Sequence, residues 1–317
     1  MARLKDGLGT RFSPAPLTTS VSLVLLVACG SSSGSGSGAD LSQNPVSSSV
    51  ISVVASTNVY GDIAEQIGGG KVKVTSIISD PDRDPHSYEA STQNQLALSK
   101  AKVVIENGGG YDDFVDRMLK SSDSSAEVIN AVEVSGKTAP AGGELNEHVW
   151  YDFPTVAELA DRIATALGEA APDEAADFTR NADDFKAGLK QLEAKEGQIK
   201  ADHGGKEVAV TEPVPLYMIE AGGLRDATPE AFSEAVEEGD DVSPRDLRAT
   251  LALFTDRKVE ALVCNEQTSG PQTEKVEQAA RTAGIPVVAF TETLSEGKDY
   301  LGWMTANVDA LASALSQ

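Results

Sequence analysis

Short β-branched runs alternate along the chain with longer segments in which an apolar residue recurs every three or four positions. Residues 50–55 form the first run, and residues 60–67 follow with helical spacing that stops at three consecutive glycines. The pattern predicts strands at 50–55, 72–78, 102–106, 128–134, 207–211, 261–264 and 287–291. It predicts helices at 60–67, 93–101, 112–120, 153–169, 172–202, 215–220, 244–256, 272–282 and 300–315.

Strands and helices in alternation are typical of an α/β fold whose mainly parallel sheets are covered on both faces. The longest predicted helix, 172–202, separates two such sets of elements, and its apolar residues recur on one face. About 30 residues at a rise of about 1.5 Å give about 45 Å, which is longer than one lobe needs. We therefore expect an N-terminal lobe at 50–171, a linking helix at 172–203 and a C-terminal lobe at 204–317.

The first thirty residues have the pattern of a bacterial secretion signal. A basic start is followed by the apolar stretch 17–27, which is shorter than the roughly 20 residues of a bilayer span. This stretch ends in Leu-Val-Ala-Cys at Cys29, which resembles the lipobox of bacterial lipoproteins, and a Gly/Ser-rich tether follows. The alternative is an ordinary signal followed by a buried cysteine. We expect a signal peptide at 1–28, acylation of Cys29, a tether at 29–49, and a lipid-anchored location on the outer face of the cell membrane.

Composition narrows the classes of function. Hydrophobic residues make up 40% of the 317 positions, which is too many for a disordered chain. Lysine and arginine total 26 against 49 aspartates and glutamates, and a chain of net charge −23 without a basic patch is repelled by nucleic acid. The two cysteines cannot build a disulfide framework or a Cys-x-x-Cys zinc site. Any imidazole chemistry must use His86, His148 or His203.

Several segments, taken in order along the chain, resemble a known family. They are DPHSYE at 84–89, KVVIENGG at 102–109, EHVW at 147–150 and SPRDL at 243–247. They are similar to the cluster A-I metal-binding receptors of bacterial ABC importers, which take up zinc, manganese or iron. The resemblance implies two α/β lobes joined by one long rigid helix, with one metal ion in the cleft between them. It also implies delivery of that ion to a membrane permease, and we expect a monomer.

The two histidines of the first lobe are the first candidate ligands. His86 lies in a polar loop on the carboxyl side of a predicted strand, where open α/β sheets place ligands. His148 lies at the end of a glycine-rich loop. By itself, His86 would be read as a solvated loop residue and His148 as a packing residue. The resemblance implies that both bind the metal ion.

The resemblance implies two further ligands in the second lobe. Glu212 follows the first strand of that lobe, where manganese- and iron-type receptors of the family carry glutamate and zinc receptors commonly carry histidine. Glu292 follows the last strand, where the family has aspartate, so the charge is kept while the carboxylate lies one methylene further out. From the residues alone, either acid also fits a helix N-terminal carboxylate.

Two imidazoles and two carboxylates suit a borderline to hard divalent cation. Zinc receptors of the family often carry a histidine-rich loop before the second ligand, and the segment 120–147 contains no histidine. We expect Mn²⁺ as the cargo, with Zn²⁺ next and Fe²⁺ as a third candidate. The Irving–Williams order means that Zn²⁺ binds in vitro whatever the physiological ion is.

Two other functions fit the same residues: a secreted metal-dependent hydrolase, and a surface adhesin stabilised by metal. A hydrolase needs an open coordination position and a general base, and four protein ligands leave little room for either. We therefore expect a receptor without enzymatic activity. The acidic run 237–241 lacks the regular alternation of a calcium loop and is expected to be solvated surface.

Overall fold

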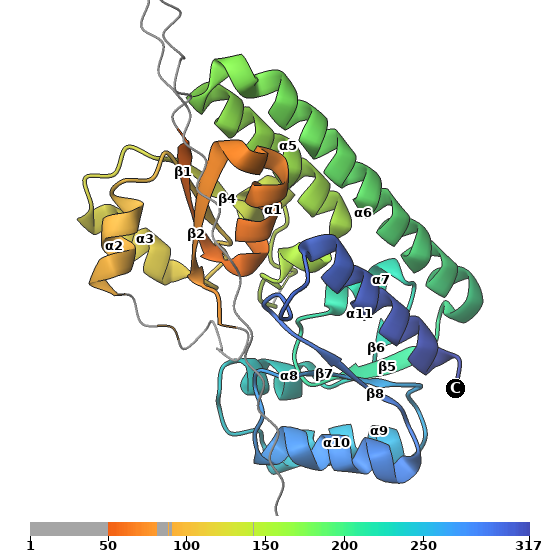
Figure 1. Ribbon diagram of the computed structural model, residues 1–317. Coiled ribbons are helices and arrows are strands. Elements are labelled where there is room, and N and C mark those ends of the chain that lie inside the picture. Colours follow the sequence, from red (N-terminus) through yellow and green to blue (C-terminus); the bar gives the residue numbers. More distant parts are fainter. Residues whose placement is uncertain (1–49, 81–87, 89–90, 142) are drawn as a thin grey trace, which may run out of the picture. The chain divides into compact units, whose positions relative to one another are not determined.

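The computed structural model describes residues 50–80, 88, 91–141 and 143–317. Ser47–Gln317 form one compact unit. Its described part contains two four-stranded sheets, in which every pair of neighbouring strands is parallel. Figure 1 shows one sheet in each lobe and a long helix, α6, running beside both. The predicted α/β class, with a parallel sheet in each of two lobes and a long connecting helix, is confirmed.

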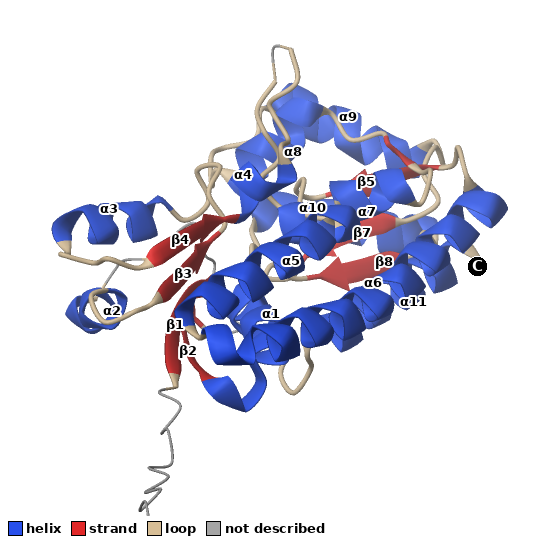
Figure 2. Ribbon diagram, turned by 90° about the horizontal axis from the view of Figure 1, so that it is seen from above, coloured by secondary structure: helices blue, strands red, loops and turns tan. Residues whose placement is uncertain are grey.

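In the N-terminal lobe, side chains that alternate along β1 face two separate apolar layers. Val53 and Ala55 belong to one core cluster and Val54 to another. The strands lie in the order β2 (Val72–Ile78), β1 (Ile51–Thr57), β3 (Val103–Glu106) and β4 (Glu127–Asn130). As Figure 2 shows, the first face is covered by α1 (Asn58–Gly68) and α5 (Phe153–Ala170), and the second by α2 (Thr92–Leu98) and α3 (Asp113–Ser121).

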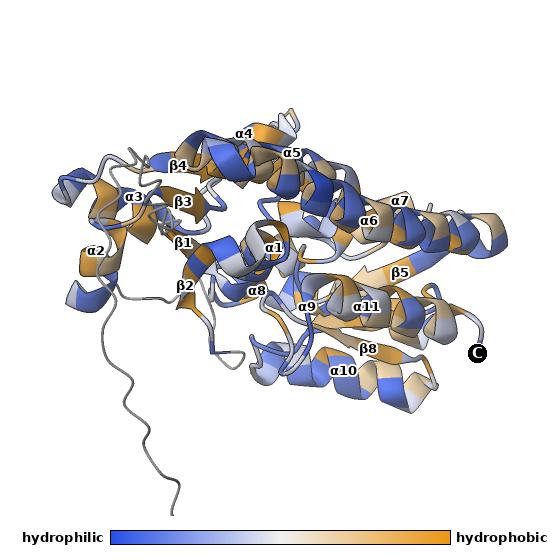
Figure 3. Cartoon of the chain, turned by 45° about the horizontal axis from the view of Figure 1, so that its top comes forward, coloured by the Kyte–Doolittle hydropathy of each residue, from blue (hydrophilic) through white to orange (hydrophobic). Residues whose placement is uncertain are grey.

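The sheet of the C-terminal lobe is built in the same way. Its strands lie in the order β6 (Arg225–Asp226), β5 (Glu207–Val210), β7 (Leu262–Asn265) and β8 (Val287–Phe290). The helices are α7 (Leu216–Ala221), α8 (Glu230–Glu237), α9 (Pro244–Thr255), α10 (Pro271–Ala283) and α11 (Tyr300–Leu315). Residues of α8, α9 and α10 share one core cluster with the sheet, and residues of α7 and α11 belong to the other. In Figure 3 the strands are mostly orange, whereas the helices carry blue stretches along their length, as expected for buried sheets under amphipathic helices.

Helix α6 (Ala175–His203) follows a single 3₁₀ turn, Pro172–Glu174, and connects the two lobes. It packs against α1 and α5 of the first lobe and against α7 and α11 of the second. The apolar cluster along it is continuous between the lobes: Phe185 of α6 lies 5.8 Å, ring centre to ring centre, from Tyr300 of α11. None of the described helices combines the length and apolar character of a membrane span.

Two parts of the predicted element order are wrong. The strand predicted through residue 134 ends at Asn130, because the Asn130 side chain accepts a hydrogen bond from Glu133 N at 2.9 Å and caps a short helix, α4 (Ala131–Ser135). The segment 221–243, for which no element was predicted, contains β6 and α8. Single 3₁₀ turns at Gly69–Lys71 and Val149–Tyr151 were also not predicted.

Glu196 is a buried carboxylate on the inner side of α6. Glu196 is only 4% exposed, and its Oε1 has no hydrogen-bond partner among the described residues. Burial raises the pKa of Glu196 from 4.5 to about 8, and the negative charges of Glu193 and Asp152 add to this. The folded protein therefore keeps a proton on Glu196 at pH values where the unfolded chain has lost it.

We predict that Glu196→Gln stabilises the protein increasingly as the pH rises. Because the folded pKa is above the unfolded one, the wild-type free energy of unfolding falls between about pH 4.5 and pH 8, and glutamine removes that loss. The gain should be below about 0.5 kcal/mol at pH 4.5 and about 4 kcal/mol at pH 8. Urea unfolding of both proteins across this range measures it. The exposed Asp184→Asn on the same helix is the control, and a Glu196→Gln effect that does not change with pH would contradict the prediction.

Candidate metal centre

Two of the candidate ligands lie where strands of the C-terminal sheet reach their carboxyl ends. Glu212 follows β5, Asn265 is the last residue of β7, and Glu292 follows β8. His148 comes from the other lobe, immediately before the 3₁₀ turn that leads into α5. Parallel strands bring their carboxyl ends to one edge of a sheet, which is why residues distant in sequence meet here.

The imidazole of His148 is fully buried and held in one orientation. Its Nδ1 lies 2.8 Å from Asn146 Oδ1, and its backbone N donates to the same oxygen at 3.1 Å. The Asn146 amide is itself oriented, because its Nδ2 donates to the carbonyl of Pro213 at 3.0 Å. Since an amide oxygen only accepts, Nδ1 of the neutral ring carries the proton and Nε2 carries the lone pair. Asn146 thereby links the histidine of one lobe to the residue that follows Glu212 in the other.

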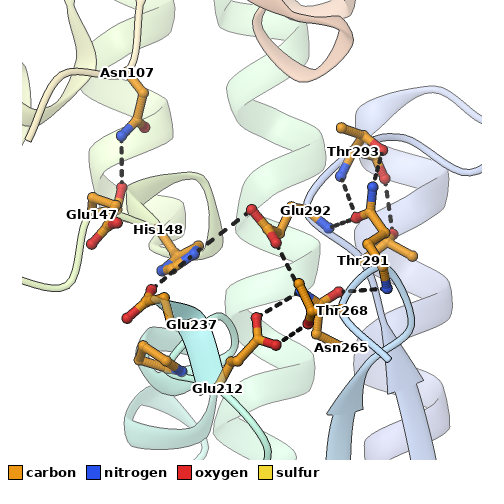
Figure 4. A network of polar contacts seen from close by, with 12 residues as sticks. Asn107, Glu147, His148, Glu212, Glu237, Asn265, Thr268, Thr291, Glu292 and Thr293 are labelled. Atoms are coloured by element: carbon orange, nitrogen blue, oxygen red, sulfur yellow. Dashed lines mark hydrogen bonds and ion pairs between the residues drawn. The ribbon is translucent and has the colours of Figure 1, made fainter. Parts of the chain in front are cut away.

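The loop that carries His148 is tied to the end of β3. Asn107 Nδ2 donates to the carbonyl of Glu147 at 3.0 Å (Figure 4), and the backbone N of Asn107 donates to Asp112 Oδ2 at 2.6 Å. Gly108, which follows, has a φ of 77°, a left-handed conformation that favours glycine. The Glu-Asn-Gly-Gly segment thus anchors the backbone beside the candidate ligand. Trp150 packs on the same ring, with centres 5.1 Å apart.

Glu212 and Glu292 are buried and share one hydrogen-bond donor. Asn265 Nδ2 donates to Glu212 Oε2 at 2.8 Å and to Glu292 Oε1 at 2.7 Å. Thr268 Oγ1 donates to Glu212, and the backbone N of Glu292 donates to Gln267 Oε1. The end of β7 therefore holds both carboxylates side by side, as Figure 4 shows.

Three of the four candidate ligands are brought together. His148 Nε2 lies 4.0 Å from Glu292 Oε2, and Glu292 is joined to Glu212 through Asn265. His86 lies outside the described residues, as does the candidate acylation site Cys29. His203 is the last residue of α6 and takes no part in this cluster. The ligand set itself remains a prediction.

The structure adds Glu237, which the sequence interpretation placed in a solvated acidic run. That interpretation is wrong for this residue. Glu237 ends α8, its side chain is 14% exposed, and its Oε1 lies 3.6 Å from His148 Nε2. Burial, and then the charges of Glu147, Glu212 and Glu292, raise its pKa to about 9. The available signal was helical periodicity, because Glu237 follows the buried Ser233 by four positions.

Glu147 is a second residue that the sequence did not single out as a ligand. Ligand atoms of Glu147, His148 and Glu237 all lie within 4.8 Å of one another. Burial raises the pKa of Glu147 to about 7. The site therefore contains more carboxylates than the predicted pair.

A cavity of about 1020 Å³ opens beside this cluster, and Glu147 and Glu237 form part of its wall. Among the described residues that line this cavity, Lys137 is the one basic residue, and it lies against the ring of Tyr217. The acidic lining residues are Glu144, Glu147, Glu220, Asp226, Glu230, Glu234, Glu237 and Glu238. A concave wall of one charge concentrates ions of the opposite charge, so the cavity favours cations.

Comparison with known proteins identifies the family of this chain. The family model for zinc-uptake complex component A (ZnuA) matches residues 53–314. The chain belongs to the ZnuA family. The metal ABC transporter substrate-binding lipoprotein SloC of Streptococcus mutans is 26% identical over 285 residues, which cover 84% of this chain and 90% of SloC. The manganese-binding lipoprotein MntA of Bacillus subtilis is 27% identical, with the same shares covered.

Solved structures show the same fold as this ZnuA-family chain. The periplasmic zinc-binding protein TroA of Treponema pallidum is 21% identical with a TM-score of 0.71, and the match covers 84% of this chain and 99% of TroA. The laminin-binding adhesin Lmb of Streptococcus agalactiae, solved as a mutant, is 21% identical with a TM-score of 0.72 and the same coverage. The two-lobe architecture is thus that of the family.

We predict that Asn265→Ala lowers the free energy of unfolding of the metal-free protein by about 2 kcal/mol, because two buried carboxylates lose a shared donor. Urea unfolding without metal measures this. The control is Gln278→Ala on the exposed face of α10, which removes a hydrogen bond to Thr282 and should change stability by less than about 0.5 kcal/mol. Equal effects of the two substitutions would show that the shared amide contributes nothing.

Proposed function

We propose that this chain is the substrate-binding component of an ABC importer and that it captures one divalent transition metal ion between its lobes. One observation carries the proposal: a buried histidine of one lobe lies beside buried carboxylates of the other. His148 Nε2 is 4.0 Å from Glu292 Oε2. Membership of the ZnuA family and the names of the relatives SloC and MntA support it. The ion is the transported cargo, which the protein releases unchanged to a membrane permease.

The ligands that we propose are His86, His148, Glu212 and Glu292. Two carboxylates neutralise a divalent ion, and this lowers the cost of removing it from water. Two imidazoles with two carboxylates suit Mn²⁺ and Zn²⁺, with Fe²⁺ as a third candidate. The buried carboxylates around His148 and the manganese-binding relative MntA favour Mn²⁺. With four protein ligands there is no role for an activated water, and we propose no enzymatic activity.

We also propose how the chain is organised around this site. Residues 1–28 are the signal peptide and 29–49 the tether, which holds the protein on the outer face of the cell membrane through a lipid on Cys29. Residues 50–171 and 204–317 are the lobes, and 172–203 is the linking helix. The named relatives are lipoproteins of ABC transporters, which supports this location. The protein acts as a monomer that meets its permease at the membrane.

We predict that Mn²⁺ or Zn²⁺ raises the melting temperature of the metal-stripped full-length chain. At 100 times the dissociation constant a ligand contributes about 2.7 kcal/mol, which corresponds to about 5–10 °C for a chain of this size. A chelator should reverse the rise. Thermal unfolding with and without each ion measures this, and no shift with Mn²⁺, Zn²⁺ or Fe²⁺ would refute the receptor function.

Replacing either His148 or His86 by alanine should abolish that shift, because each removes a nitrogen ligand. His203→Ala is the matched control, since His203 ends α6 outside the cluster. Its metal-induced shift should equal that of wild type. A normal shift in both His148→Ala and His86→Ala would place the metal site elsewhere.

We predict that Cys29→Ser releases the protein from the membrane, because serine cannot form the thioether that carries the lipid. Fractionation of cells and the mass of the mature protein measure this. Cys264→Ser is the control, because Cys264 is buried in β7, and it should stay in the membrane fraction. An unchanged mass and membrane retention of Cys29→Ser would exclude the lipid anchor.

A further inference from the structure

We propose that Glu237 binds the metal ion directly, beside His148, and favours Mn²⁺ over Zn²⁺. This inference rests on the proposed metal-binding function and extends its ligand set. It assigns a role to Glu237, the last residue of α8, which the sequence interpretation placed in a solvated acidic run. Figure 4 shows the Glu237 carboxylate directed at the same face of His148 as the Glu292 carboxylate.

The distances fit a shared ion better than a hydrogen bond. Glu237 Oε1 lies 3.6 Å from His148 Nε2, which is longer than the roughly 3.2 Å limit of an ordinary N–H···O bond. Two ligand atoms, each about 2.1 Å from one ion at a tetrahedral angle, are about 3.4 Å apart. The separation of Glu237 and His148 is close to that value, so an ion between them needs little movement of either side chain.

The position of Glu237 is set by the packing of its helix. Phe232 of α8 is fully buried in the core cluster of the C-terminal lobe, and Val236 packs against that cluster. These contacts fix the rotation of α8 and turn its last residue toward the other lobe. A ligand on a packed helix is held more precisely than one on a loop.

The described side chains around Glu237 are mainly other carboxylates, and no lysine or arginine among them balances its negative charge. Its side chain is 14% exposed, and Oε1 has no hydrogen-bond partner among the described residues. The charged groups acting on it are Glu147, Glu212, Glu292 and Glu238, and in the described part of the chain no lysine or arginine forms an ion pair with it. A buried carboxylate among other carboxylates is costly unless it takes up a proton or a cation compensates its charge. A divalent ion in the cluster provides that compensation.

A further carboxylate changes which ion fits best. Oxygen ligands shift preference toward manganese, whereas zinc is satisfied by four ligands in a tetrahedron. The four predicted ligands include two carboxylates, and Glu237 adds a third. Removing it should therefore cost more affinity for Mn²⁺ than for Zn²⁺.

Calorimetric titration of the metal-stripped full-length chain tests the inference, with Asp240→Asn as the matched control because Asp240 is an exposed acid of the same run and does not line the cavity. We expect Glu237→Gln to weaken Mn²⁺ binding about tenfold or more and Zn²⁺ binding less, with Asp240→Asn within about twofold of wild type. Metal-free melting temperatures establish that each variant is folded. Normal Mn²⁺ affinity in Glu237→Gln overturns the inference and leaves the proposed function standing. Absence of metal binding by wild type would instead refute the proposed function.

Glu237→His separates direct binding from positioning. Imidazole is a good zinc ligand of comparable reach, so this variant should recover or exceed the wild-type affinity for Zn²⁺ while remaining weak for Mn²⁺. A residue that only oriented His148 would gain nothing from a second nitrogen ligand. Failure of Glu237→His to bind Zn²⁺ better than Glu237→Gln would overturn direct binding by Glu237.

Discussion

The burial of several carboxylates around one histidine is the constraint on which the site depends. Glu212 and Glu292 are almost fully enclosed, and the amide of Asn265 donates a hydrogen bond to each of them. Such a cluster is stable only if hydrogen-bond donors satisfy it or a cation compensates it. Asn265, at the end of β7, is the donor for both carboxylates. His148 Nε2 lies 4.0 Å from the other oxygen of Glu292. We propose that a divalent ion supplies this compensation.

The scaffold supplies that cluster by bringing two sheet edges together. Helix α6 packs on both lobes, and the apolar core beside it is continuous from α1 to α11. At the site the two lobes also meet through polar contacts: Tyr217 donates to the carbonyl of Asn146 at 2.6 Å, and Asn146 donates to that of Pro213. Aromatic packing continues beside them, because Tyr151 of one lobe stacks on Phe290 of the other with ring centres 5.7 Å apart. Together these contacts bring the ligands of one lobe to those of the other.

The acidic cavity connects the chemistry of the site to the surface. The described part of its lining carries one lysine and eight carboxylates, and Glu147 and Glu237 belong both to the cavity wall and to the cluster around His148. Electrostatic attraction in such a concave wall raises the local concentration of cations. In the sequence, the net charge of −23 only argued against binding to nucleic acid. In the structure, part of this negative charge lines the cavity through which a cation would enter.

Local pattern determined most of the secondary structure, the α/β class and the linking helix, because helical and strand periods are properties of neighbouring residues. The family resemblance, and not the local pattern, singled out His148, Glu212 and Glu292, since from the residues alone His148 fits a packing residue and the two acids fit helix N-terminal carboxylates. Local pattern failed at 131–135, where a short apolar run fits both periods and the Asn130 cap decides for a helix. Tertiary structure alone decided the role of Asn146, Asn265 and Glu237. Their contacts join segments from 27 to 89 positions apart, such as Asn265 with Glu292 and Glu237 with His148, and only the packing of α8 and of the two lobes brings such segments within reach.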